Sequence, residues 1–260
     1  MLPIRDHNPS EKTPFVTYAL IAINVVVFFS YWGQMDNARY IAGFFDAYAF
    51  TPRDLSQNGE VLGLFTSMYL HGGFMHLAGN MLFLWIFGDN MEEEFGHVGF
   101  FVFYTVSGVA ATLAHYLAAP YSPIPLVGAS GAIAGVMGGY LLLFPKAKVD
   151  ILFIFVIFFR IFSVPAWLML GVWFGLQLLN GSGGASDGVA YWAHAGGFIV
   201  GFVLALPIWI KRGATTYWQT NAGHPPHPEA KYRWQDSRVP TVRRGQRLGT
   251  RVPIVKRTRK

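Results

Sequence analysis

The chain has 260 residues, of which 53% are hydrophobic and only 13% are charged. Soluble domains carry about 25% charged residues, so this composition indicates a membrane protein. The absence of cysteine excludes disulfides, thiolate metal sites and a cysteine nucleophile. The net charge of +6 is concentrated at one end, because residues 211–260 hold 13 of the 20 Lys and Arg side chains.

Apolar runs long enough to cross a bilayer, about 20 residues each, are predicted in chain order. The clear ones are 14–33, 73–88, 98–119, 130–144 and 191–210. The stretch 149–180 is ambiguous, because Arg160 and Pro165 interrupt it. We interpret 151–159 as an interfacial or re-entrant piece, too short for a span, and 165–179 as the remaining span.

The sequence therefore predicts an all-α polytopic membrane protein with six spans. Residues 1–13 form an N-terminal segment, 14–210 the six-helix domain, and 211–260 a basic tail. The tail has few large apolar residues, so we expect it to be disordered. A basic tail of this kind can also bind anionic lipid. An additional span before Pro165 would reverse the direction in which the last helix crosses the membrane.

The basic residues predict the orientation. With six spans and an inner N-terminus, the loops on the inner side hold most Lys and Arg of the membrane domain, as the positive-inside rule requires. We therefore expect both termini to be cytoplasmic. The second, fourth and sixth helices then run from the outside inward, and their N-terminal ends lie near the outer leaflet.

Polar residues collect at the starts of those three helices. The second carries His76 and Asn80 on one face, the fourth begins at Ser130, and the sixth carries His194. A serine hydroxyl needs a base within hydrogen-bond reach to act as a nucleophile, and histidine is the usual one. A helix N-terminus offers free N–H groups to a developing oxyanion. His76 and Asn80 could donate to the same oxygen.

Small residues give the two helices a means of close approach. A single membrane serine is more often a local hydrogen-bonding group, a membrane histidine is often structural, and small-residue repeats are common. The serine, the histidine and the small-residue repeats occur together at one depth of the membrane, and this combination favours a catalytic site over the three separate structural readings. No Asp or Glu lies near His194 within a span, so the pattern predicts a dyad and not a triad. The glycines repeat every four residues, Gly131, Gly135 and Gly139 on the fourth helix and Gly197 and Gly201 on the sixth.

These residues together resemble the rhomboid family of intramembrane serine proteases over roughly residues 62–210. The resemblance implies a six-helix rhomboid-like bundle with Ser130 as nucleophile, His194 as general base and His71 in a structural role. It also implies that His76, Asn80 and the Ser130 amide form the oxyanion hole. The matching motifs are FTSMYLHGGFMH at 65–76 with Asn80, GASG at 128–131, and AHAGG at 193–197 with Gly201.

The resemblance further implies cleavage of transmembrane protein substrates near the outer membrane face, without a cofactor or metal. We expect a multi-pass protein of a bacterial cell membrane, in contact with lipid and not with nucleic acid. Two positions depart from the family. Leu62-Gly63 replaces a Trp-Arg pair, and Ala134 replaces the aromatic residue that packs against the catalytic histidine, so Tyr191 or Trp192 is expected to orient His194.

Three alternatives remain at this stage. The first is a catalytically silent rhomboid-like protein that binds membrane clients; such proteins lack the serine or the histidine, and both are present here. A transporter would need a polar pathway, which the inner halves of these helices lack. A zinc protease of the HExxH type is disfavoured because that motif does not occur.

Overall fold

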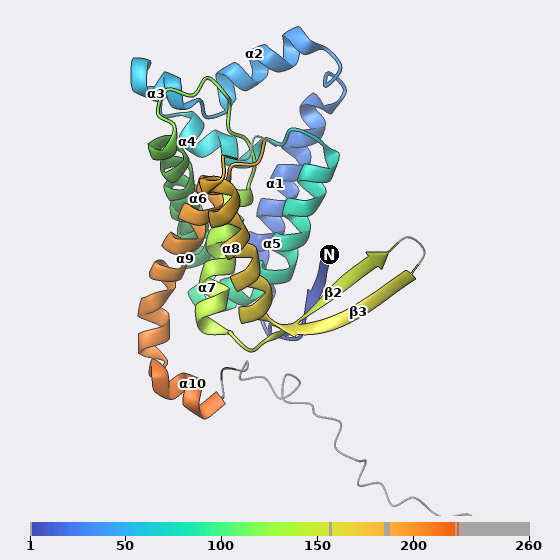
Figure 1. Ribbon diagram of the computed structural model, residues 1–260, viewed down its shortest axis with the longest axis vertical. Helices are drawn as coiled ribbons and strands as arrows, with labels where there is room; N and C mark the ends of the chain where they lie inside the picture. The colour runs from blue at the N-terminus through green and yellow to red at the C-terminus, as the bar shows by residue number, and fades with distance from the viewer. Residues whose placement is uncertain (1, 156–157, 185–187, 222, 224–260) are drawn as a thin grey trace, which may run out of the picture.

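The computed structural model describes residues 2–155, 158–184, 188–221 and 223. A bundle of helices is flanked at one end by short helices and at the other by a small sheet (Figure 1). The short helices are α2 (Ala38–Tyr48), α3 (Pro52–Asn58), α4 (Gly63–Thr66) and the 3-10 turn Ser67–Tyr69.

Helices stand at all six places where the sequence predicts spans. Within the described residues, three of them are long and apolar enough to cross a membrane, and a fourth candidate joins Gly63–Tyr69 to the next helix through a 93° bend. The chain is therefore a multi-pass membrane protein, and the count of six spans remains a proposal. The six are α1 (Phe15–Trp32), α5 (Phe74–Phe95), α6 (His97–Ala118), α7 (Ser130–Leu143), α8 (Ala166–Ser182) and α9 (Tyr191–Lys211).

The all-α prediction is wrong for one part of the chain. The strands β1 (Leu2–Asp6), β2 (Lys148–Phe155) and β3 (Phe158–Pro165) form an antiparallel sheet in the order β1-β2-β3. The first part of the ambiguous stretch thus lies in a β-hairpin, which extends away from the helices (Figure 1), and the second part is α8. The physical reason is the hairpin's run of Ile, Phe and Val residues, which favour strands over helices.

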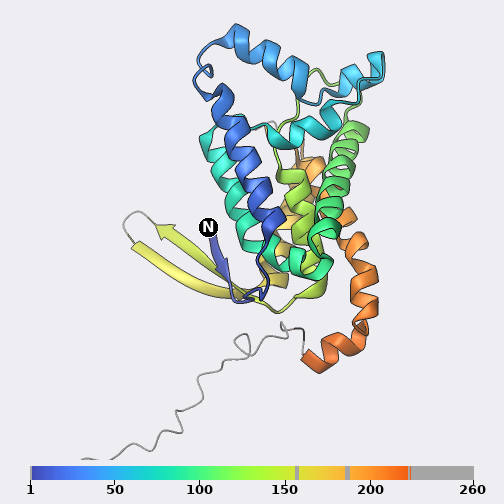
Figure 2. The same cartoon turned by 180° about the vertical axis from the view of Figure 1, so that it is seen from behind.

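Helix α7 forms the centre of the bundle. Nearly all of its residues are buried, as expected of a helix that is apolar on every side. Figure 2 shows it between α5 and α6, and α9 packs along it. The approach of α7 to α9 is set by backbone, because Gly131 faces Gly197 and Gly135 faces Gly201 without room for a side chain between them. Gly139 instead faces Met91, Phe103 and Ala205.

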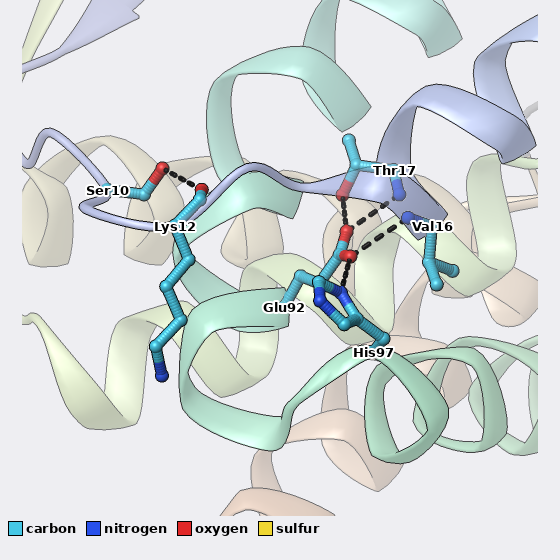
Figure 3. Close-up of polar contacts among 6 residues, drawn as sticks. All are labelled: Ser10, Lys12, Val16, Thr17, Glu92 and His97. Carbon is cyan, nitrogen blue, oxygen red and sulfur yellow. Dashed lines mark hydrogen bonds and ion pairs between the residues drawn. The ribbon is translucent and has the colours of Figure 1, made fainter.

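A buried carboxylate from another helix caps the N-terminus of α1. Pro14 makes no side-chain cap, so the free N–H groups of the first turn of α1 need another acceptor. Glu92 on α5 supplies it, accepting from Val16 N at 2.8 Å and from Thr17 N at 2.7 Å (Figure 3). The same carboxylate accepts from Thr17 Oγ1 and contacts His97 Nδ1. Glu92 therefore joins α1, α5 and α6 at one end of the bundle.

At that same end, one acid attaches the sheet to the bundle and a second one joins its strands. Tyr140 on α7 donates to Asp6 at 2.6 Å. Burial raises the pKa of Asp6 to about 7, with a contribution from nearby Asp89, although the Tyr140 hydrogen bond lowers it. Burial would also raise the pKa of Asp150, but hydrogen bonds from Ser163, His7 and Arg5 outweigh it and lower this pKa to about 2.

The predicted tail is structured at its start. Lys211 is the last residue of α9, and α10 (Thr215–Asn221) follows beneath the bundle. Trp218 Nε1 donates to the carbonyl of Leu142 at 3.0 Å, so this segment caps the end of α7. Disorder was expected for all of 211–260, and it does not hold for α10. Residues 222 and 224–260 lie outside the described part of the chain.

Candidate functional site

Two residues that the sequence places 64 positions apart meet at the heads of α7 and α9. Ser130 is the first residue of α7, and His194 lies in the first turn of α9. Ser130 Oγ is 2.8 Å from His194 Nε2, which is hydrogen-bond distance. The glycine contacts further along α7 and α9 allow this approach, because they bring the two helix axes close together.

A glycine shapes the turn that leads into α7. Gly128 has φ +126°, a conformation that other residues rarely adopt. Its N–H donates to the carbonyl of Ser67 at 2.9 Å. A Cβ at this position would lie 2.8 Å from His76 Nε2, so glycine also leaves the space that His76 occupies. The GASG motif thus supplies both the glycine that the turn before α7 requires and the serine at the start of α7.

The side chains of His76 and Asn80 come from one face of α5 and line the same cavity as Ser130 and His194. Asn80 is buried, and its Nδ2 has no hydrogen-bond partner among the described residues. A buried donor without a partner is unusual in a folded protein and often marks a functional position. Asn80 therefore offers an unused N–H donor, among the described residues, in the cavity that Ser130 also lines.

His71 lies outside this cavity. Its side chain is fully buried, and its ring packs edge-on against His76 with centroids 5.1 Å apart. Its backbone is held by the Tyr31 hydroxyl, which accepts from His71 N at 2.8 Å and donates to His71 O at 2.9 Å. The loop before α5 is thus tied to α1.

The Leu62-Gly63 departure has a packing counterpart in the same region. A Cβ at Gly63 would lie 2.5 Å from the carbonyl oxygen of Ala49 and 2.7 Å from the Cα of Phe50. Glycine therefore permits backbone contact between α4 and residues 49–50, where a larger residue would not fit.

The cavity has a volume of about 500 Å³ and is mostly apolar. Its polar side chains are the four already described. An apolar cavity with a few convergent polar groups is typical of a ligand or active site. Beyond those four, the walls consist of Gly72, Met75, Gly79, Phe83, Pro125, Leu126, Val127, Ile133, Met137, Trp173, Gly188, Val189 and Ala190.

Sequence reasoning missed two residues on α8 that contact His194. Gln177 Oε1 lies 2.9 Å from His194 Nδ1, and the Trp173 ring packs at 5.7 Å between centroids with a 34° tilt. Both contacts come from α8, whereas the sequence predicts one from Tyr191 or Trp192 on α9; the Trp192 indole is close to Gly181. The available signal was Gln177 itself, a lone amide in an apolar span, because polar side chains in spans are usually functional.

In the parts of the chain with described placement, no group of three or more His, Cys, Asp or Glu side chains is arranged to hold a metal ion.

Comparison with known proteins identifies the chain's relatives. The model of the Rhomboid domain family matches residues 58–211, more than half of the chain. The chain belongs to the rhomboid family. The matched region contains every polar residue of the cavity and the glycines of α7 and α9.

Curated rhomboid relatives extend the similarity. The chain is 31% identical over 204 residues to rhomboid protease GluP of Bacillus subtilis, covering 77% of this chain and 36% of the relative. It is 31% identical over 188 residues to mitochondrial rhomboid protein 1 of Saccharomyces cerevisiae, covering 68% and 52%. The chain thus spans about a third to a half of these relatives. Two of the relatives, GluP and the putative rhomboid protease YdcA of Bacillus subtilis, are named as proteases.

Proposed function

We propose that this chain is an intramembrane serine endopeptidase that cleaves transmembrane protein substrates with a Ser130–His194 dyad. The observation that carries the proposal is the 2.8 Å separation of Ser130 Oγ and His194 Nε2 in a cavity of about 500 Å³. A hydroxyl and an imidazole at this distance form the nucleophile–base pair that acyl transfer requires.

The first half-reaction follows from this geometry. Ser130 Oγ attacks the carbonyl carbon of the scissile peptide bond while its proton moves to His194 Nε2. The carbonyl oxygen becomes an oxyanion, for which Asn80 Nδ2, His76 and the Ser130 backbone N–H are the proposed donors. The C–N bond then breaks, the leaving nitrogen takes the proton from His194 Nε2, and an ester to Ser130 remains.

The second half-reaction repeats these transfers with water. His194 Nε2 takes a proton from a water molecule as the water oxygen attacks the ester carbonyl. The tetrahedral intermediate collapses, the proton returns to Ser130 Oγ, and the carboxylic product leaves. No step needs a cofactor. The unpartnered Nδ2 of Asn80 supports its place in the oxyanion hole, because an oxyanion would give this buried donor an acceptor.

The surroundings support a membrane substrate. The proposed site lies at the end of the bundle that carries α2, α3 and α4, and the basic residues favour this end as the outer one. We therefore propose cleavage near the outer face of a bacterial cell membrane, with cytoplasmic termini and membrane lipid around the helices. Relatives from mitochondria and chloroplasts show that the family also occurs in organelles.

The test compares Ser130→Ala and His194→Ala with the parent in proteoliposomes that contain a model transmembrane substrate. We expect each variant to lose cleavage and labelling by a fluorophosphonate while remaining folded. Cleavage at the parental rate by either variant would refute the dyad. A parent that neither cleaves nor labels, yet retains substrate in pull-down experiments, would favour the catalytically silent alternative.

A further inference from the structure

Gln177 lies behind the catalytic pair, on the far side of the histidine ring from the serine. Its Oε1 is 2.9 Å from His194 Nδ1, and Ser130 Oγ is 2.8 Å from His194 Nε2. Only 8% of Gln177 is exposed. The three side chains thus form one line of hydrogen bonds that runs from α8 through α9 to α7.

The orientation of the Gln177 amide is set by its own helix. Gln177 Nε2 donates to the carbonyl of Trp173, one turn earlier, at 3.3 Å. A carbonyl oxygen only accepts, so the amide nitrogen must face Trp173 and the amide oxygen must face the ring. The reversed amide would place two acceptors against each other at Trp173, which disfavours it.

This orientation determines the histidine tautomer. The amide oxygen also only accepts, so His194 Nδ1 must carry a hydrogen. In a neutral imidazole Nε2 then has the lone pair, and this lone pair faces the Ser130 hydroxyl. The opposite tautomer would direct an N–H at the serine and leave two acceptors facing each other at Gln177. Gln177 therefore favours the tautomer in which His194 Nε2 can accept the serine proton, as general-base catalysis requires.

We propose that Gln177 is a positioning residue that holds His194 in the tautomer and ring orientation required for catalysis. This inference rests on the proposed protease function. Gln177 takes the place that a carboxylate occupies in a catalytic triad, and none of the ion pairs among the described residues involves His194.

A neutral amide suits this environment. A buried carboxylate within a membrane protein carries a large desolvation cost unless it is fully paired. An amide fixes the tautomer without that cost. When His194 takes the serine proton, Nδ1–H still donates to the amide oxygen, and a hydrogen bond from a charged donor is stronger than a neutral one.

Trp173 completes the support from α8. Its ring lies against His194 and, four residues before Gln177, occupies the same face of the helix. Ala134 leaves no aromatic contact from α7, and Trp173 provides one from α8 instead. A single face of α8 thus supplies both a hydrogen bond and an aromatic contact to the histidine ring.

The test uses two variants of the full chain in proteoliposomes. Gln177→Met keeps the length of the side chain and removes the acceptor; Gln177→Glu keeps an acceptor oxygen at the same distance. We expect kcat of the Met variant to fall by at least about tenfold, since general-base catalysis is worth ~10²–10⁴-fold. KM should change by less than about twofold, because Gln177 is not expected to touch substrate. The Glu variant should retain clearly more activity than the Met variant.

A spectroscopic measurement separates positioning from packing. In ¹⁵N-histidine spectra, assigned with His194→Ala, the parent and Gln177→Glu should show a protonated Nδ1 on His194, and Gln177→Met a mixture of tautomers. Leu176→Met, on the exposed side of α8, is the matched control and should retain parental kcat.

The outcomes distinguish this inference from the proposed function. If Ser130→Ala is inactive but Gln177→Met retains parental kcat and tautomer, Gln177 has no positioning role and the protease assignment stands. Equal losses in the Met and Glu variants with an unchanged tautomer would also overturn the inference in favour of packing. Activity in Ser130→Ala would instead remove the proposed function itself.

Discussion

The contact between Gly135 and Gly201 leads to a quantitative prediction. A Cβ added to Gly201 would lie under 3.0 Å from three main-chain atoms of Gly135, including its carbonyl oxygen. Comfortable contacts are about 3.5–4.0 Å, and main-chain atoms cannot rotate away. Helices α7 and α9 must therefore separate by about 1 Å even for Gly201→Ala, although alanine is a small residue.

The expected cost follows from that separation. A misplacement of about 1 Å between reacting groups can reduce a rate on the order of a hundredfold. Overpacking a membrane helix interface should also cost about 1–3 kcal/mol of stability. We expect Gly201→Ala to reduce kcat by about tenfold to a hundredfold, and Gly201→Leu to reduce it further. Residue 201 is two turns from His194 and does not line the cavity, so KM should change little.

The assay compares kcat, the rate of fluorophosphonate labelling and Tm for both variants. Gly171→Ala is the matched control, since a Cβ there would meet nothing within 4 Å, and it should behave as the parent or be slightly more stable. If Gly201→Ala is folded and retains the parental kcat and labelling rate, backbone contact between α7 and α9 does not set the distance between Ser130 and His194.

Two further predictions concern pH and orientation. Because burial raises the pKa of Asp6 from 3.8 to about 7, protonated Asp6 contributes stability below about pH 4 that is lost as the pH rises to about 7. The Tm of the parent should therefore fall between pH 5 and 8, and that of Asp6→Asn should fall less; identical profiles would contradict this role. In this cysteine-free chain, Gln57→Cys should react with an impermeant thiol reagent in intact cells and Lys146→Cys only after lysis, whereas the reverse pattern would invert the proposed orientation.

Much of the site followed from local patterns in the sequence. Runs of apolar residues located the helices, and the polar residues at three helix starts predicted a common depth. The glycine repeats predicted a close approach of α7 and α9. In the structure, Ser130 and His194 come within hydrogen-bond distance at the ends of these two helices. These features could be predicted from the sequence because each depends on the spacing of residues along one helix.

Features that depend on distant pairing were not predicted. The hairpin of β2 and β3 consists mostly of apolar residues, and their number fits neither a span nor a loop. Periodicity alone cannot separate a strand from a buried helix in such a run. Gln177 was not predicted as a partner of His194, because the absence of nearby carboxylates predicted a dyad and the orienting contact was assigned to Tyr191 or Trp192. The role of Glu92 as a cap was not predicted either, because no local pattern shows that its carboxylate oxygens face the N–H groups of α1.

The cap that Glu92 provides bears on how the protein is made. Val16 and Thr17 leave the ribosome some 75 residues before the carboxylate that accepts their N–H groups. Until α5 has been synthesised, water at the membrane surface must satisfy the first turn of α1. Helix α1 therefore acquires its attachment at this end only after α5, which follows it in the chain, has been made. At this end of the bundle, the synthesis of α1 therefore precedes its docking by at least the length of chain that separates Thr17 from Glu92.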